Sequence, residues 1–279
     1  MKISIMSHCF YEEFASGAIE FDGFISFCSD IKADGIELSD HHLAEKDYEN
    51  AGKKLLDAGL ELPSYVIVAD FVQADEKIMD NEVGKVMEKI DRAAYYGGKH
   101  VMVSPGGIKE GLNLEEARKL IIKGLKKVSS YAARKGITLS IENHGGFARL
   151  RGKIQHMKEF IDNIPALSLT YDVGNYLMAG DEPLYALKEL YGRIVHVHLK
   201  DFVISNEAKD TNTKTYKGVP IGEGIVPNLD VIKILKKSGY SGYLSIEYGG
   251  NIPPDIGVKR SLRYLKNVLN ENNMVDIVI

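Results

Sequence analysis

Residues 138–142 read TLSIE, a short run in which polar and apolar side chains alternate. Successive side chains of a strand point to opposite faces, so Leu139 and Ile141 lie on one face while Ser140 and Glu142 lie on the other. Three later runs have the same alternation and carry polar residues on one face: SLTYD at 168–172, IVHVHL at 194–199 and YLSIE at 243–247. We therefore expect strands with one apolar face against helices and one polar face toward a shared interior.

The whole chain alternates short apolar runs with longer segments of helical periodicity. We predict strands at 3–7, 35–38, 62–66, 100–104, 138–142, 168–172, 194–199 and 243–247, with helices between them. Eight such units predict a single-domain α/β fold over residues 1–279, the (β/α)₈ TIM barrel. A doubly wound sheet is the alternative, but the first strand is followed by Ser7-His8-Cys9-Phe10 rather than by a glycine-rich nucleotide-binding turn.

Composition and charge narrow the class of partner. The 279 residues carry a net charge of −4, and no basic cluster is longer than Lys126-Lys127, which argues against nucleic acid and anionic membranes. No apolar run approaches the roughly 18–20 residues of a membrane span, and the first ten residues do not resemble a signal peptide. Cys9 and Cys28 are too few for a disulfide framework, so we expect buried thiols, a cytoplasmic protein and small-molecule partners.

The polar face of the last four strands ends in four residues that suit a metal: Glu142, Asp172, His198 and Glu247. In a TIM barrel the C-terminal ends of the strands form the active site. Three carboxylates and an imidazole in a partly dry cavity repel one another unless a cation lies between them. We therefore predict one divalent metal ion, and the ligand set accepts Mn²⁺, Mg²⁺, Co²⁺ or Zn²⁺ alike. Asp172 taken alone also suits a helix N-cap.

Five motifs carry a family resemblance: SIENHGG at 140–146, YDVGN at 171–175, HVHLKD at 196–201, GEG at 222–224 and IE at 246–247. In order and spacing they resemble the xylose isomerase-like TIM barrel superfamily, and more narrowly its sugar phosphate isomerase/epimerase branch, which is related to ketose 3-epimerases and inosose dehydratases. The resemblance implies one divalent metal ion on the same four residues. It also implies that Glu142 and Glu247 are the catalytic residues that move the substrate proton.

Two positions depart from the ketose 3-epimerases of that superfamily. Those enzymes have a histidine and an arginine where this chain has Asn175 and Ile204, which argues against a free-ketose 3-epimerase. Abasic-site nucleases of the endonuclease IV type share part of the seventh-strand motif, but they need further histidine ligands and a basic groove that this sequence lacks. Xylose isomerase itself is longer and uses a second metal site, which cannot be assembled here.

Five polar residues near the predicted metal site are candidate substrate contacts: His8, His144, Asn175, His196 and Lys200. The sequence leaves His8 and His144 equally compatible with buried, hydrogen-bonded histidines, and it favours a supporting or stacking role for His196. Lys200 suits either a contact to a substrate anion or an ion pair with Glu247 or Asp201. The inward-facing Glu37 suits either a buried charge partner or a site residue.

The polar stretch from Asp201 to Pro227 follows the seventh strand. At the rim it would act as a lid with hinges at Gly218 and Gly222, or it is a surface insertion without a role. The apolar end, residues 274–279, is compatible with packing beneath the barrel or against a second subunit of a homo-oligomer.

These observations predict a divalent-metal-dependent sugar isomerase or epimerase that acts on a ketose, keto-polyol or derivative. One glutamate would remove the proton beside the carbonyl to give an enediolate, and the other would return a proton to it. Expulsion of a β-hydroxyl from the same enediolate would make the protein a dehydratase. A non-catalytic sugar-binding barrel is the alternative outside enzymes.

Overall fold

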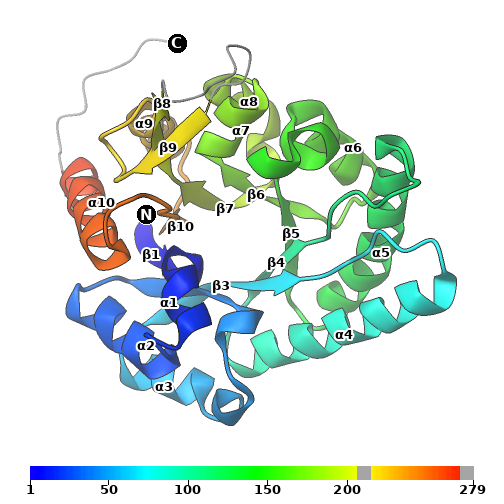
Figure 1. Cartoon of the computed structure of the whole chain (residues 1–279), viewed down its shortest axis with the longest axis horizontal. Coiled ribbons are helices and arrows are strands. Elements are labelled where there is room, and N and C mark those ends of the chain that lie inside the picture. Colours follow the sequence, from blue (N-terminus) through cyan, green and yellow to red (C-terminus); the bar gives the residue numbers. More distant parts are fainter. Residues whose placement is uncertain (206–214, 271–279) are drawn as a thin grey trace.

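The computed structural model describes residues 1–205 and 215–270. Eight parallel strands close into a barrel in the order β1-β10-β7-β6-β5-β4-β3-β2, and helices surround it (Figure 1). This confirms the predicted (β/α)₈ barrel and excludes the doubly wound sheet. Residues 206–214 of the polar stretch and the apolar end at 274–279 lie outside the described residues, so the predictions made on them are not tested.

The strands of the barrel match the expected positions within two residues. They are β1 (Lys2–Met6), β2 (Gly35–Ser39), β3 (Glu61–Val68), β4 (His100–Ser104), β5 (Thr138–Glu142), β6 (Ser168–Asp172), β7 (Ile194–Leu199) and β10 (Tyr243–Ile246). β1 ends before Ser7 because a 3₁₀ turn occupies Ser7–Phe10. This earlier end moves His8 from the predicted strand end to the turn.

Helices cover the outer face of the barrel. They are α1 (Tyr11–Ser16), α2 (Phe21–Asp30), α3 (Ala51–Asp57), α4 (Glu76–Tyr95), α5 (Leu114–Arg134), α6 (Ile154–Asn163), α7 (Val173–Ala179), α8 (Pro183–Leu190), α9 (Asn228–Lys237) and α10 (Pro254–Asn270). Helix α5 begins at Leu114 because the Asn113 side chain accepts hydrogen bonds from the Glu115 and Glu116 amides, while the Glu116 carboxylate accepts one from the Asn113 amide.

The predicted alternation of the strands holds. Leu139 and Ile141 are fully buried on the apolar face, and burying such a side chain stabilises the fold by about 1.5–3 kcal/mol. On the axial face, Ser140 Oγ lies 2.7 Å from both His100 Nε2 and Thr170 Oγ1. Polar side chains that bond to one another therefore occupy this part of the barrel interior.

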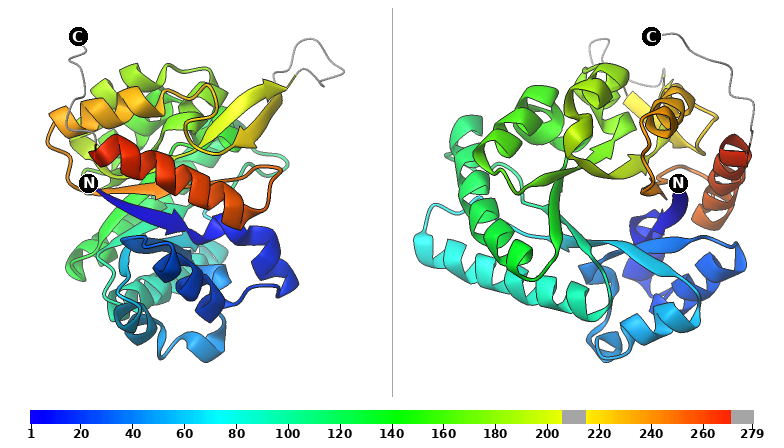
Figure 2. Two further views of the ribbon diagram at one scale, coloured as in Figure 1. Left: turned by 90° about the vertical axis from the view of Figure 1, so that its left-hand side faces the viewer. Right: turned by 180° about the vertical axis from the view of Figure 1, so that it is seen from behind.

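A two-stranded antiparallel hairpin, β8 (Asp201–Ser205) and β9 (Thr215–Val219), follows β7. It lies beyond the end of the barrel toward which β1 points (Figure 2, left). Both Asp201 carboxylate oxygens accept backbone hydrogen bonds from the turn after the hairpin, including those of Gly222, Gly224 and Val226. The amide of the predicted hinge at Gly222 is thus bound to Asp201.

Cys9 and Cys28 are free and buried, as predicted. In residues 1–205 and 215–270 no helix has both the length and the apolar composition that crossing a membrane requires.

Candidate metal and catalytic site

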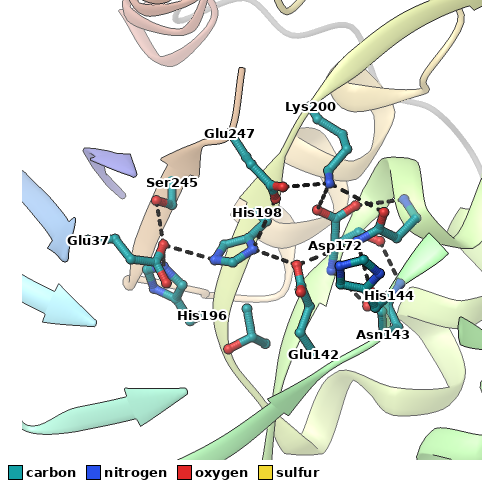
Figure 3. A network of polar contacts seen from close by, with 12 residues as sticks. Glu37, Glu142, Asn143, His144, Asp172, His196, His198, Lys200, Ser245 and Glu247 are labelled. Atoms are coloured by element: carbon teal, nitrogen blue, oxygen red, sulfur yellow. Dashed lines mark hydrogen bonds and ion pairs between the residues drawn. The ribbon is translucent and has the colours of Figure 1, made fainter. Parts of the chain in front are cut away.

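Four strand ends bring the predicted metal ligands together. Glu142 ends β5, Asp172 ends β6, His198 lies in β7 and Glu247 directly follows β10. One ligand atom from each residue lies within 4.8 Å of the others, and the side chains converge in Figure 3. The arrangement follows from strand parity, because each of these residues occupies the axial face at the C-terminal end of a parallel strand.

Local hydrogen bonds fix the ends of β5 and β6 against each other. The Asn143 amide donates to the Asp172 carbonyl oxygen and accepts from the Asp172 N–H, both at 2.9 Å. Asp172 Oδ1 accepts the Asn175 N–H at 2.6 Å and so caps α7. The other oxygen, Oδ2, faces the cluster, so the two readings of Asp172 from sequence, N-cap and site residue, are compatible.

The four side chains form a strongly coupled electrostatic cluster. His198 Nδ1 lies 2.8 Å from Glu142 Oε1 and 3.4 Å from Glu247 Oε2. Burial alone would lower the pKa of His198, but the charges of Glu37 and Glu142 outweigh it and raise that pKa well above 6.5. Burial alone would raise the pKa of Glu142, yet its hydrogen bond to His198 brings that pKa below the usual value.

Asp172 has the opposite shift from its neighbours. Burial, with repulsion from Glu247 and Glu142, raises the pKa of Asp172 well above 3.8 although Lys200 opposes the shift. Its Oδ2 atom and Glu247 Oε2 are buried and accept no hydrogen bond from the described residues. Carboxylate oxygens that accept no hydrogen bond and lie beside an imidazole form a donor set that divalent cations bind, so these residues suit a metal ion.

Lys200 lies beside the same cluster. Its Nζ is 2.8 Å from Glu247 Oε1, 3.2 Å from Asp172 Oδ2 and 3.3 Å from Asn175 Oδ1. Burial lowers the pKa of Lys200, but the charges of Asp172 and Glu247 outweigh it and raise that pKa. Of the pairings that the sequence left open, the structure shows the one with Glu247, whereas Asp201 binds backbone amides.

A cavity of about 430 Å³ opens at this end of the barrel. Glu247 and Lys200 form part of its wall, and His8, Tyr11, Tyr216 and Tyr248 line it as well. Its size suits a small molecule with several polar groups, and the aromatic rings offer apolar faces to it.

The comparisons with known proteins agree with this geometry. A family model described as the xylose isomerase-like TIM barrel matches residues 25–268. The chain belongs to this family. An inosose dehydratase of Clostridium botulinum is 33% identical over 147 residues, which are 48% of this chain and 47% of the relative. The chain spans about half the length of the curated relatives it matches.

Two solved structures share the fold of this xylose isomerase-like barrel. The IOLI protein with a bound zinc atom superimposes with a TM-score of 0.79 at 17% identity, covering 99% of this chain and 100% of that one. A D-tagatose 3-epimerase-like protein gives a TM-score of 0.74 at 22% identity, covering 96% and 97% of the two chains. At these identities the likeness shows the fold alone.

The predicted substrate contacts fall at different depths of this xylose isomerase-like barrel. His8 is exposed at the cavity wall. Half-buried His144 accepts the Gly146 N–H at 3.1 Å, and burial lowers its pKa. Buried Asn175 donates to the Asn143 carbonyl oxygen at 3.0 Å. His196 lies below the cluster, where its Nε2 bonds to Glu37 Oε2 at 3.0 Å, and it does not line the cavity.

Glu37 is the residue whose role the sequence left open. It lies on the axial face of β2, is fully buried and bonds to both His196 and His198 (Figure 3). Strand alternation predicts that Glu37 faces inward, but no local pattern links it to histidines about 160 residues away. That pairing depends on closure of the barrel, which places β1 and β10 between β2 and β7.

Proposed function

We propose that this chain is a divalent-metal-dependent enzyme that removes a proton beside the carbonyl of a ketose, keto-polyol or related carbohydrate, and that it works as an isomerase or epimerase. The observation that carries the proposal is the pair of glutamates, Glu142 and Glu247, which lie on either side of His198 Nδ1 in one cluster. The zinc atom in the IOLI structure supports a metal in a barrel of this fold.

Glu142, Asp172, His198 and Glu247 would hold the metal ion. When bound, a divalent ion supplies positive charge that stabilises the oxyanion formed as a carbonyl enolises. Glu142, Asp172 and His198 are buried and Glu247 is partly buried, which limits the access of water to the reacting carbon and strengthens each electrostatic contact.

The two glutamates supply the proton transfers. A carboxylate with a low pKa is deprotonated at neutral pH, and the pKa values of Glu142 and Glu247 are both lowered, so either is ready to accept a proton. Return of a proton to the same carbon from the opposite face gives epimerisation, and return to the neighbouring carbon gives isomerisation. Lys200, beside Glu247, would hold a negatively charged oxygen of the substrate in place.

Dehydration is the second candidate. The curated relatives are named inosose dehydratases, and the Lys200 ammonium on the cavity wall would stabilise a departing hydroxyl. After the same proton removal, loss of a β-hydroxyl as water would give a conjugated enone or a diketone.

Proton NMR in deuterated water tests the shared step. The metal-loaded protein is incubated with ketoses, inososes and 3-keto-sugars, and deuterium is expected at a carbon beside the carbonyl. Glu247→Gln should slow this exchange by about 10²–10⁴-fold, which is the usual contribution of a general acid or base. Glu76→Gln, a surface change on α4 that removes an ion pair with Lys123, should leave the rate unchanged.

The products then separate the two candidates. A new ultraviolet absorbance identifies dehydration, whereas a new sugar isomer without that absorbance identifies isomerisation or epimerisation. Deuterium exchange at the wild-type rate in Glu247→Gln would refute the assignment of Glu247 to proton transfer. Absence of exchange from every substrate, with metal tightly bound, would favour the sugar-binding alternative.

A further inference from the structure

One carboxylate oxygen of Glu37 makes three hydrogen bonds beneath the metal cluster. Oε2 accepts from Ser245 Oγ at 2.7 Å, from His198 Nε2 at 2.9 Å and from His196 Nε2 at 3.0 Å. Glu37 is fully buried, so these three groups are the polar partners of Oε2 in the interior of the barrel. The Ser245 hydroxyl donates to this oxygen, which identifies it as a hydrogen-bond acceptor.

This contact distinguishes the two ring nitrogens of His198. A metal ion bound to Nδ1 would leave Nε2 as the ring nitrogen that carries hydrogen, and the Glu37 oxygen 2.9 Å away lies where it would accept that hydrogen. The opposite nitrogen, Nδ1, then points at Glu142 and Glu247. A neutral imidazole protonated on Nε2 has its lone pair on Nδ1, directed at the centre of the ligand cluster.

Glu37, His196 and His198 also lie close enough to share a cation of their own. The distances between the nitrogens and Oε2, 2.9 and 3.0 Å, are those of direct N–H···O hydrogen bonds. The Ser245 hydroxyl donates to the same Oε2 atom at 2.7 Å, so hydrogen bonds satisfy this oxygen without an ion. The group is better described as a hydrogen-bonded support for His198 than as a second metal site.

We propose that Glu37 is a positioning residue, which holds His198 in the tautomer protonated on Nε2 and so directs Nδ1 at the metal. The inference rests on the metal site of the proposed function. Carboxylates that orient a ligating histidine typically contribute about 10- to 100-fold to metal affinity.

Zinc titration against a competing chelator measures this contribution without reference to activity. Glu37→Gln keeps the shape of the side chain but removes its charge and allows the amide to donate to His198. We expect its zinc affinity to fall by roughly 10- to 100-fold. Ser245→Ala is the matched control, because it removes one hydrogen bond from the same Glu37 oxygen and leaves the link to His198 intact. Its affinity should stay within about threefold of the wild type.

Nitrogen-15 NMR of the zinc-loaded protein reads the tautomer directly. In the wild type we expect the His198 Nε2 to carry its proton and Nδ1 to be the bound nitrogen, and in Glu37→Gln we expect the Nε2–H signal to shift. Circular dichroism establishes which variants are folded. If Glu37→Gln does not fold, Glu37→Asp, which keeps the charge but withdraws it by one methylene, should show the affinity loss instead.

The outcomes separate this inference from the proposed function. If the wild-type protein binds no divalent metal ion, the metal site is refuted, and both proposals are refuted with it. Wild-type binding with an unchanged affinity in folded Glu37→Gln or Glu37→Asp overturns the role of Glu37 alone. Zinc on Nε2, or a second zinc equivalent that is lost in Glu37→Gln, would make Glu37 part of a ligand set and also overturn it.

Discussion

Asp172→Asn should stabilise the metal-free protein while it weakens metal binding. Asparagine keeps the oxygen that caps α7 through the Asn175 N–H, and it replaces a carboxyl group whose pKa is raised well above 3.8 by burial and by neighbouring glutamates. In the folded, metal-free protein this carboxyl group tends to retain its proton, whereas in the unfolded chain it is ionised at neutral pH. Asparagine carries no charge in either state.

The sign and the upper limit follow from proton linkage. A carboxyl group with a raised folded-state pKa binds more protons in the folded state, so its contribution to stability is full below pH 3.8 and is lost as the pH rises. At 1.36 kcal/mol per pH unit, the loss between 3.8 and pH 7 is at most about 4 kcal/mol. Asp172→Asn avoids this loss, so for a chain of 279 residues its unfolding temperature at pH 7 should rise by as much as roughly 7 °C.

Calorimetric unfolding of chelator-treated proteins at pH 4.5 to 8 measures the effect. The difference between Asp172→Asn and the wild type should be small at the acid end and should grow with pH. Zinc should stabilise the wild type much more than the variant, because one ligand oxygen has been replaced by an amide.

The same substitution at Asp201 provides the matched control. Asp201 is also buried, but its oxygens accept backbone N–H bonds from Gly222, Gly224 and Val226. An amide there would turn N–H groups toward N–H groups, which costs about 3 kcal/mol or more. Asp201→Asn should therefore destabilise the protein. Equal destabilisation by the two substitutions would refute the argument that burial and the neighbouring glutamates disfavour an ionised carboxylate at Asp172.

Further predictions address metal binding, thiol reactivity and the hairpin. The charges of Glu37 and Glu142 raise the pKa of His198 well above 6.5, so a metal ion must displace the proton of this histidine. Metal affinity should therefore rise by up to about tenfold per pH unit near neutrality. Calorimetry in buffers of different ionisation enthalpy counts the protons released. Burial raises the pKa of Cys9 to about 12 and that of Cys28 well above 9.0. Neither thiol should therefore react with a disulfide reagent at pH 8 until the protein unfolds. Rapid reaction of the native protein would contradict this prediction. A methyl group at Gly218 would lie 1.8 Å from a backbone oxygen of the loop after β10, so Gly218→Ala should cost about 1–3 kcal/mol in a denaturant titration, and an unchanged midpoint would show that the hairpin is not held there.

Much of the site could be predicted from local patterns. Alternation along each strand identified Glu142, Asp172 and Glu247 as inward residues at strand ends, and the barrel then had to bring them together. The prediction for His8 was less complete, because parity assumed that β1 continued past Met6, where a 3₁₀ turn begins. Side chains do not alternate between two faces in a turn, so strand alternation does not predict their orientation there.

The fold class and the inward position of Glu142, Asp172, His198 and Glu247 follow from the sequence alone, because hydrophobic periodicity and strand parity are local properties of the chain. The three-dimensional structure was needed to show how the charges pair: Lys200 with Glu247 rather than Asp201, and Glu37 with His198. The pair of Glu37 and His198 depends on barrel closure, which carries β7 within reach of β2 across the interior, far from it in sequence. Electrostatic interactions depend on distance and burial in three dimensions, and neither quantity is present in the order of the residues.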